Sequence, residues 1–532
     1  MIRRASVGRH LLAAPIHPLL AAAYPVVFLF AQNVADQVTL GPLWVPLASS
    51  IGAAVAGLVV FRLLLGDWFR AALITTLLAA VFFSFGHVWF VSGEFLGLRR
   101  YLVGAYLLVG LAGAWAVWRG GGWVVPLTRA LNLLLAMLVL VNVYGIVSFT
   151  VDAPEAASVG TALQVSADGR DRPDVYYVIL DRYANSWTLE NLYDYDNREF
   201  LDELRARGFF VAEEAWANYF KTAFSLASSL DANALDADAL RSGSREGQEF
   251  GPIHAMLRGH LAAPLTFKSL GYEYVHVGTY WPPSATNVDA DVTFNYGDGL
   301  EFSTALGETT ALSLLSPARP AATGRTTYTH DLIRQFHEFG FEKLKGAADR
   351  DGPTFTFAHF LLPHPPYVHL SDGRIPTPAD ERRSVAVQYT DQMEYTNLRV
   401  LEAIDTIRAS PGGEEAVIIV QGDEGPFPAA FDDNERHFSW LDASREQVAE
   451  KFGILNAVSL PGADSGAVGL HSRSTPINTF RIVLNHLFDA DLPLLPEVIN
   501  LSPDYVQPYD FVPIERDASG MPILPGPEGT DQ

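Results

Sequence analysis

The stretch Asp174-Val-Tyr-Tyr-Val-Ile-Leu-Asp181 (residues 174–181) decides the fold class of this 532-residue chain. Its unbroken apolar row is typical of a strand that is buried on both faces and ends at an acid. Further strands are expected at 209–212, 273–278, 354–360, 416–420 and 454–460. Helices are expected at 196–207, 222–230, 329–346, 386–408 and 474–488. Strands that alternate with helices of this length predict an α/β fold whose mostly parallel sheet is covered on both faces.

Five apolar stretches come before this region, and each is close to the roughly 20 residues that a helix needs to cross a bilayer. They lie at 17–34, 42–64, 71–92, 101–118 and 124–149. A signal peptide would not repeat five times. We therefore expect a transmembrane domain of five helices (1–150), a polar linker (151–172), an α/β domain (173–502) and an irregular, proline-rich tail (503–532).

Charge is distributed very unevenly along the chain, whose net charge is −23. Residues 1–150 hold three acids, nine arginines and no lysine, so the rest carries a net charge of −29. An acidic surface of that size repels phosphate backbones and argues against nucleic-acid binding. The chain has no cysteine, which excludes disulfides, thiolate metal sites and cysteine nucleophiles.

The arginines also predict the orientation in the membrane. With the N-terminus inside, seven arginines fall on the cytoplasmic side and two on the other, in line with the positive-inside bias. The seven are Arg3, Arg4, Arg9, Arg62, Arg70, Arg119 and Arg129, and the two are Arg99 and Arg100. Five crossings would place residue 151 onward outside the cytoplasm, in a multi-pass protein of the plasma (inner) membrane. The apolar stretches hold almost no ionisable residues, which disfavours a transporter.

Acids and a histidine follow three of the expected strands. Asp181 ends the first strand, Asp423 and Glu424 follow the strand at 416–420, and His359 lies at the end of the strand at 354–360. The carboxyl ends of parallel strands meet at one edge of a sheet. Carboxylates that converge there repel each other unless a cation intervenes, so a divalent metal ion is expected. The alternative is that the acids cap helices or bind loop amides.

Thr222 stands at the expected start of a helix, in the segment 218–230. A threonine there is an ordinary helix cap. It is also a competent nucleophile when a metal lowers the pKa of its hydroxyl and the helix N-terminus attracts an anion.

An ordered set of segments carries a family resemblance, among them PDVYYVILDRYA (173–184), NYFKTAFSLASSL (218–230), FTFAHFLLPHPPY (355–367), VIIVQGDEGP (417–426) and STPINTFR (474–481). In this order the chain resembles the sulfatase-like hydrolase/transferase family of the alkaline phosphatase superfamily. Membrane helices in front of such a domain are similar to those of lipoteichoic acid synthases and lipid A phosphoethanolamine transferases. The resemblance implies an alkaline-phosphatase-like α/β/α domain.

The resemblance also implies roles for individual residues. Asp181, Thr222, Asp423 and Glu424 take the places of the metal ligands, for one or two ions of Mn, Mg, Ca or Zn, and Thr222 takes that of the nucleophile. His359, His364 and, by a looser spacing, His437 take the places of substrate-binding histidines, although a surface histidine is the alternative for His437. Without a cysteine, and with Thr222 at the nucleophile's place, phosphoryl transfer is expected rather than sulfatase chemistry.

Glu424 departs from the family pattern, which has histidine at that place. An anionic oxygen ligand favours harder cations than an imidazole does. Two functions stay open. One is a membrane-bound, extracytoplasmic, metal-dependent hydrolase or transferase acting on phosphoesters of a phospholipid or an envelope glycan. The other is a catalytically degenerate envelope protein with a binding or scaffolding role; the oligomeric state is left open in both.

Overall fold

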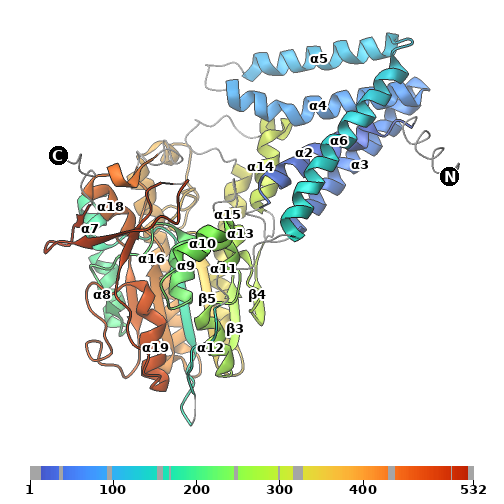
Figure 1. Cartoon of the computed structure of the whole chain (residues 1–532). Coiled ribbons are helices and arrows are strands. Elements are labelled where there is room, and N and C mark those ends of the chain that lie inside the picture. Colours follow the sequence, from blue (N-terminus) through green and yellow to red (C-terminus); the bar gives the residue numbers. More distant parts are fainter. Residues whose placement is uncertain are drawn as a thin grey trace, which may run out of the picture. The chain divides into compact units, whose positions relative to one another are not determined.

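The computed structural model describes residues 14–34, 40–92, 99–151, 160–166, 169–244, 250–296, 300–315, 327–428, 438–504 and 506–524. The chain divides into two compact units (Figure 1). Unit 1 comprises Met1–Ala153 and Gly297–Thr329, and unit 2 comprises Pro154–Tyr296 and His330–Gln532. Each unit is described by itself below.

Unit 1 is built from apolar helices. They are α2 (His17–Gln32), α3 (Gly41–Leu65), α4 (Trp68–Ser92), α5 (Arg99–Arg119) and α6 (Val124–Val151). Among the described residues, four of them, α3 to α6, are long and apolar enough to cross a membrane, whereas α2 is a shorter apolar helix of 16 residues. The expected helical positions are therefore occupied, but the expected count of five spanning helices is not confirmed.

Unit 1 also contains a segment from much later in the chain. Helix α14 (Leu300–Thr309) and the 3₁₀ turn η1 (Ala311–Leu315) group with the membrane-type helices. Phe302 and Leu306 of α14 join an apolar cluster with Val26 and Phe30 of α2, where the rings of Phe30 and Phe302 meet edge to face at 5.6 Å. The expected boundaries, with 173–502 as one domain, are wrong here, because apolar side chains of α14 are buried against helices of residues 1–150.

Unit 2 contains a seven-stranded sheet in the order β2-β7-β6-β1-β5-β3-β4. Its strands are β1 (Val175–Leu180), β2 (Phe210–Val211), β3 (Glu273–Val277), β4 (Val292–Phe294), β5 (Thr354–Phe360), β6 (Val417–Gly422) and β7 (Asn456–Ser459). β1 lies between β5 and β6 and is parallel to both, while β7 is antiparallel to β6 and to β2. The sheet is mostly parallel, as expected.

Helices surround this sheet (Figure 1). They are α7 (Ser186–Leu192), α8 (Arg198–Ala206), α9 (Thr222–Leu230), α10 (Ala237–Gly243), α11 (Gly251–Leu257), α12 (Ala262–Ser269), α13 (Pro282–Ala285), α15 (Thr327–Gly346), α16 (Val385–Ala409), α18 (Arg445–Phe452) and α19 (Thr479–Phe488). Alternate residues of β1 enter two different cores, because successive side chains of a strand point to opposite faces. Tyr177 and Ile179 join the core that contains α9, α12 and α19, and Tyr176 and Val178 join the core that contains α8 and α16.

The C-terminal part forms a second, three-stranded sheet of β8 (Ile499–Leu501), β9 (Val512–Arg516) and β10 (Pro522–Ile523). The proline-rich sequence predicts an irregular tail after residue 502. That expectation is wrong for β9 and β10, because antiparallel pairing with β8 and with each other satisfies their backbone groups. Ile514 of β9 is buried in the core that contains α9.

Candidate functional site

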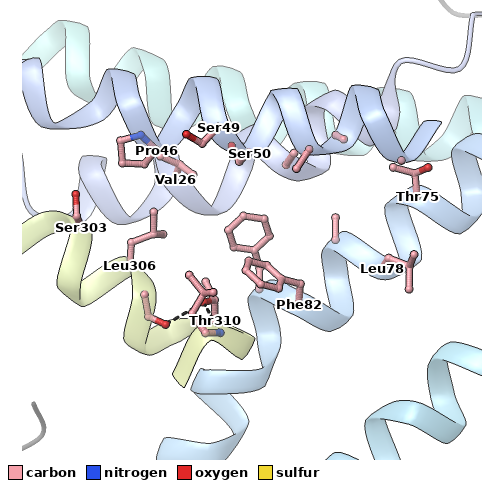
Figure 2. Close-up of a pocket in the computed structure, with 18 of the residues that line it drawn as sticks. Val26, Pro46, Ser49, Ser50, Thr75, Leu78, Phe82, Ser303, Leu306 and Thr310 are labelled. Carbon is pink, nitrogen blue, oxygen red and sulfur yellow. Dashed lines mark hydrogen bonds between the residues drawn. The ribbon is translucent and has the colours of Figure 1, made fainter. Parts of the chain in front are cut away.

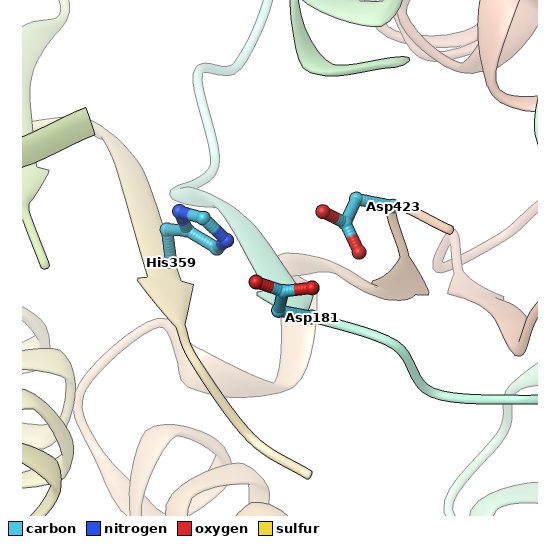
Figure 3. A group of neighbouring side chains, drawn as sticks. All are labelled: Asp181, His359 and Asp423. Carbon is cyan, nitrogen blue, oxygen red and sulfur yellow. The ribbon is translucent and has the colours of Figure 1, made fainter. Parts of the chain in front are cut away.

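Three strand ends bring Asp181, His359 and Asp423 together (Figure 3). Asp181 follows β1, His359 lies in β5, and Asp423 follows β6. Because β1 is the central strand and pairs with both others, their carboxyl ends meet at one edge. Each residue offers one donor atom, and these atoms all lie within 4.8 Å of one another. All three residues are buried.

The donor atoms of this group are available to a ligand. Asp181 Oδ1, Asp423 Oδ2 and His359 Nε2 are buried and have no hydrogen-bond partner among the described residues. Buried polar atoms in folded proteins are normally paired, so unpaired atoms at one point indicate a missing partner. Two carboxylates and an imidazole suit a divalent cation. The residues present therefore fit a metal ion.

The electrostatics of the three residues also fit a bound metal ion. Burial, and secondarily the charges of Asp423 and Glu424, raise the pKa of Asp181 well above its usual range. Burial and the charge of Glu424 raise the pKa of Asp423 to about 7. Adjacent carboxylates disfavour each other's ionised form, and a cation between them would relieve that repulsion.

His359 is held as a neutral imidazole. Burial, with a smaller contribution from His276, lowers the pKa of His359 to about 3. Its Nδ1 lies 2.9 Å from Ser284 Oγ, and Ser284 Oγ lies 2.8 Å from Thr279 Oγ1. A proton on Nδ1, donated to Ser284, leaves the lone pair of Nε2 facing the two acids.

Thr222 is the first residue of α9. A hydrogen bond from its side chain lowers the pKa of Asp423, against the larger raising effects. The hydroxyl of Thr222 is therefore next to the acid pair and at a helix N-terminus, where the helix dipole and free backbone N–H groups attract anions.

Glu424 belongs to a neighbouring ion pair. It lies outside the group of three donors, and its Oε2 lies 2.8 Å from Nζ of Lys451, which is fully buried in α18. Its Oε1 lies 3.9 Å from Nε of Arg182. Both cations also contact the ring of Phe427, with Lys451 Nζ at 3.2 Å and Arg182 Cζ at 4.1 Å from its centre.

Of the other two expected histidines, the structure describes only His364. The ring Nδ1 of His364 contacts the carbonyl oxygen of Pro365, and His364 is absent from the group of metal-capable side chains. His437 lies outside the described residues.

Sequence reasoning missed four residues around the acid pair. Arg182 directly follows Asp181, and its backbone N–H donates to Asp423 Oδ1 at 3.2 Å. Lys221 precedes Thr222, and its Nζ lies 5.9 Å from the centre of the Phe427 ring. Proximity to the quoted motifs could have identified these two. Ser284 and Lys451 carry no local signal, because only tertiary contacts bring α13 and α18 to the strand ends.

Comparisons with known proteins detect similarity at the level of structure. No family model matches the chain, and no curated protein matches it in sequence. The periplasmic domain of EcEptC from Escherichia coli matches with 12% identity and a TM-score of 0.41, over 65% of this chain and 94% of that one. A structure of the same domain in complex with Zn matches with 12% identity and a TM-score of 0.37, over 64% and 93%.

An integral membrane protein also matches. Lipooligosaccharide phosphoethanolamine transferase A (EptA) from Neisseria meningitidis has 14% identity and a TM-score of 0.40, over 88% of this chain and 95% of that one. All these likenesses are distant, so the function is argued below from the chain's own residues.

Proposed function

We propose that this protein is a membrane-bound, extracytoplasmic, metal-dependent enzyme that transfers or hydrolyses a phosphoester group of a lipid-linked or envelope substrate through Thr222. One observation carries the proposal. Three buried donors with unpaired atoms converge within 4.8 Å at the strand ends, and the side chain of Thr222 is close enough to one of them, Asp423, to lower its pKa.

Asp181, His359 and Asp423 would hold the metal ion. Bound there, a divalent cation would supply a Lewis acid that lowers the pKa of a neighbouring hydroxyl and neutralises charge on a phosphate. The nitrogen donor of His359 favours Zn²⁺ or Mn²⁺ over Mg²⁺ and Ca²⁺, which prefer oxygen ligands. This assigns His359 to the metal rather than to the substrate.

Thr222 would be the nucleophile. Its Oγ forms a bond to phosphorus while the bond from phosphorus to the leaving alcohol breaks, which gives a phospho-threonine. Water or an acceptor hydroxyl then takes the group from Thr222. The N-terminus of α9 would stabilise the phosphate charge through its backbone N–H groups.

Two cations, one after Asp181 and one before Thr222, would bind the phosphate oxygens. Arg182 follows a metal-ligand acid, and its Nε is buried without a hydrogen-bond partner among the described residues. Lys221 precedes the nucleophile directly. Charge-assisted hydrogen bonds to a phosphate are among the strongest that side chains make.

Glu424 would serve as the counterion of Lys451 and not as a metal ligand. The 2.8 Å contact between Lys451 Nζ and Glu424 Oε2 already neutralises Glu424. A glutamate in place of the family's histidine is therefore compatible with an active metal site, because His359 supplies the imidazole.

The experiment compares Asp423→Ala with Thr222→Ala in the purified full-length protein. Asp423→Ala should lose most bound Zn²⁺ or Mn²⁺ by elemental analysis. Thr222→Ala should keep most of the metal and yet form no phospho-enzyme with a chromogenic phosphodiester, whereas Thr222→Ser should still form it. A wild-type protein that binds no divalent metal and forms no phospho-enzyme would favour the scaffolding function.

A further inference from the structure

A pocket in unit 1 is enclosed by α2, α3 and α4 together with α14 and η1 (Figure 2). It has a volume of about 480 Å³. The lining residues are Ala22, Val26, Pro46, Ser49, Ser50, Ala53, Ala54, Gly57, Phe61, Thr75, Leu78, Ala79, Phe82, Phe83, Ser303, Leu306, Gly307, Thr310 and Leu312. None of these carries a charge, so the pocket suits an uncharged, apolar ligand.

The polar groups in the lining are largely satisfied within their own helices. Ser50 Oγ donates to the carbonyl of Leu47 at 3.0 Å, Thr75 Oγ1 to that of Ala71 at 2.9 Å, and Thr310 Oγ1 to that of Gly307 at 2.9 Å. A buried water needs two to four polar partners. The pocket offers water few of them and therefore favours hydrocarbon.

The shape of the pocket fits a single chain. Its lining follows α3 from Pro46 to Phe61, which at 1.5 Å per residue is a length of about 22 Å. A pocket of this length along α3 accommodates an extended hydrocarbon chain.

The helices around the pocket identify the source of that chain. α3 and α4 are long and apolar enough to span a bilayer, so in a membrane the hydrocarbon tails of lipids surround them. α14 approaches them closely, because a Cβ placed on Gly86 of α4 would lie 2.0 Å from the carbonyl oxygen of Glu308. A glycine at this point allows the backbone of α14 to form one wall of the pocket.

We propose that this pocket binds one acyl chain of a membrane phospholipid. All lining residues of this site belong to unit 1. The pocket binds its ligand by burying hydrocarbon, and its lining offers no charged group to a lipid headgroup. The headgroup therefore lies outside the described lining.

Photo-crosslinking tests the proposal on the full-length protein. It would be reconstituted in vesicles of phosphatidylethanolamine and phosphatidylglycerol, with each lipid in turn carrying a diazirine on one acyl chain. Mass spectrometry should locate label on both the α3 stretch 46–61 and the α14–η1 stretch 303–312. Label confined to other faces of the helices would overturn the proposal.

Gly307→Leu is the blocking variant. Gly307 lines the pocket, and a Cβ placed on it meets nothing within 4 Å, so a larger side chain can begin there in open space. Gly307→Leu should lower label on the α3 stretch by about tenfold or more. The leucine and the acyl chain would compete for the same volume, and this overlap should weaken binding of the chain by more than about 1.4 kcal/mol. Gly52→Leu is the matched control, because Gly52 is also in open space but outside the lining. Its label should stay equal to that of the wild type.

Ala53→Leu fills the pocket from α3 and replaces Gly307→Leu if that variant does not fold, as judged by size exclusion and thermal unfolding. Wild-type labelling in a folded blocking variant would refute the proposal. All variants should keep their bound metal. Failure of metal binding or of phospho-enzyme formation would count against the proposed function and not against the pocket.

Discussion

At the scale of single residues, Ser284 orients His359 from the side opposite the acids. Its hydroxyl is the partner of His359 Nδ1 at 2.9 Å. Ser284→Ala should weaken metal binding by about 10–100-fold, as loss of a partner behind a ligating histidine does. Competition with a chromophoric chelator measures the affinity.

Ser502→Ala is the control for Ser284→Ala. Ser502, directly after β8, is also buried and donates one hydrogen bond, to the carbonyl of Pro508 at 2.8 Å. The Ser502→Ala variant should bind metal with the same affinity as the wild type. Equal losses in both variants would mean that general destabilisation, and not orientation of His359, explains the effect.

Asp423 makes the stability of the metal-free protein depend on pH. Its pKa rises from 3.8 to about 7 on folding, so the folded state binds more protons than the unfolded state between about pH 4 and 7. Asp423 therefore stabilises the fold below about pH 4, and this contribution is lost as the pH rises through 7. Thermal unfolding in a chelator should show Tm falling over this window.

Added metal should reverse this trend, because it binds the deprotonated carboxylates. The rise in Tm caused by Zn²⁺ or Mn²⁺ should therefore be larger at pH 8 than at pH 5. Asp423→Asn should flatten both dependences. An unchanged slope in Asp423→Asn would show that other groups dominate the titration.

At the scale of elements, α18 is tied to the loop after β6 by a buried ion pair. Lys451 and Glu424 meet at 2.8 Å with almost no exposure. Removing one partner of such a pair leaves an uncompensated buried charge, so Lys451→Met should lower the free energy of unfolding by about 3–5 kcal/mol. Denaturant unfolding in detergent measures the loss.

The double variant Lys451→Met/Glu424→Gln tests the cause. It should recover a large part of the lost stability, because the buried charge of Glu424 is removed together with that of Lys451. Full additivity of the two single changes would show that the pair is not coupled. Metal content should persist in the double variant if Glu424 is not a ligand.

At the scale of the whole molecule, the arginine bias predicts that unit 2 lies outside the cytoplasm. The absence of cysteine gives thiol labelling a zero background. Cysteine at Ala518, exposed between β9 and β10, should react with an impermeant maleimide in right-side-out vesicles. Cysteine at Gly122, exposed between α5 and α6, should react only after permeabilisation. The opposite pattern would invert the topology.

Most of the helices and strands could be predicted from the sequence alone. The apolar row at 354–360 became β5 with those bounds, and the strand expected at 174–180 became β1 at Val175–Leu180. The pattern and the length of apolar runs predict such elements. A strand buried on both faces needs a short continuous apolar run, and a lipid-facing helix needs a long one. The same logic placed Asp181, His359 and Asp423 at one sheet edge.

Tertiary structure decided which of these side chains face each other. Asp423 and Glu424 are adjacent in sequence, but only Asp423 joins Asp181 and His359, because Lys451 from α18 engages Glu424. No local pattern encodes that partner, since it lies 27 residues further on in the chain. The sequence could not predict that α14 belongs to unit 1 either. A helix of ten residues is too short to be recognised as a membrane segment, and its apolar face is explained only by the helices that bury it.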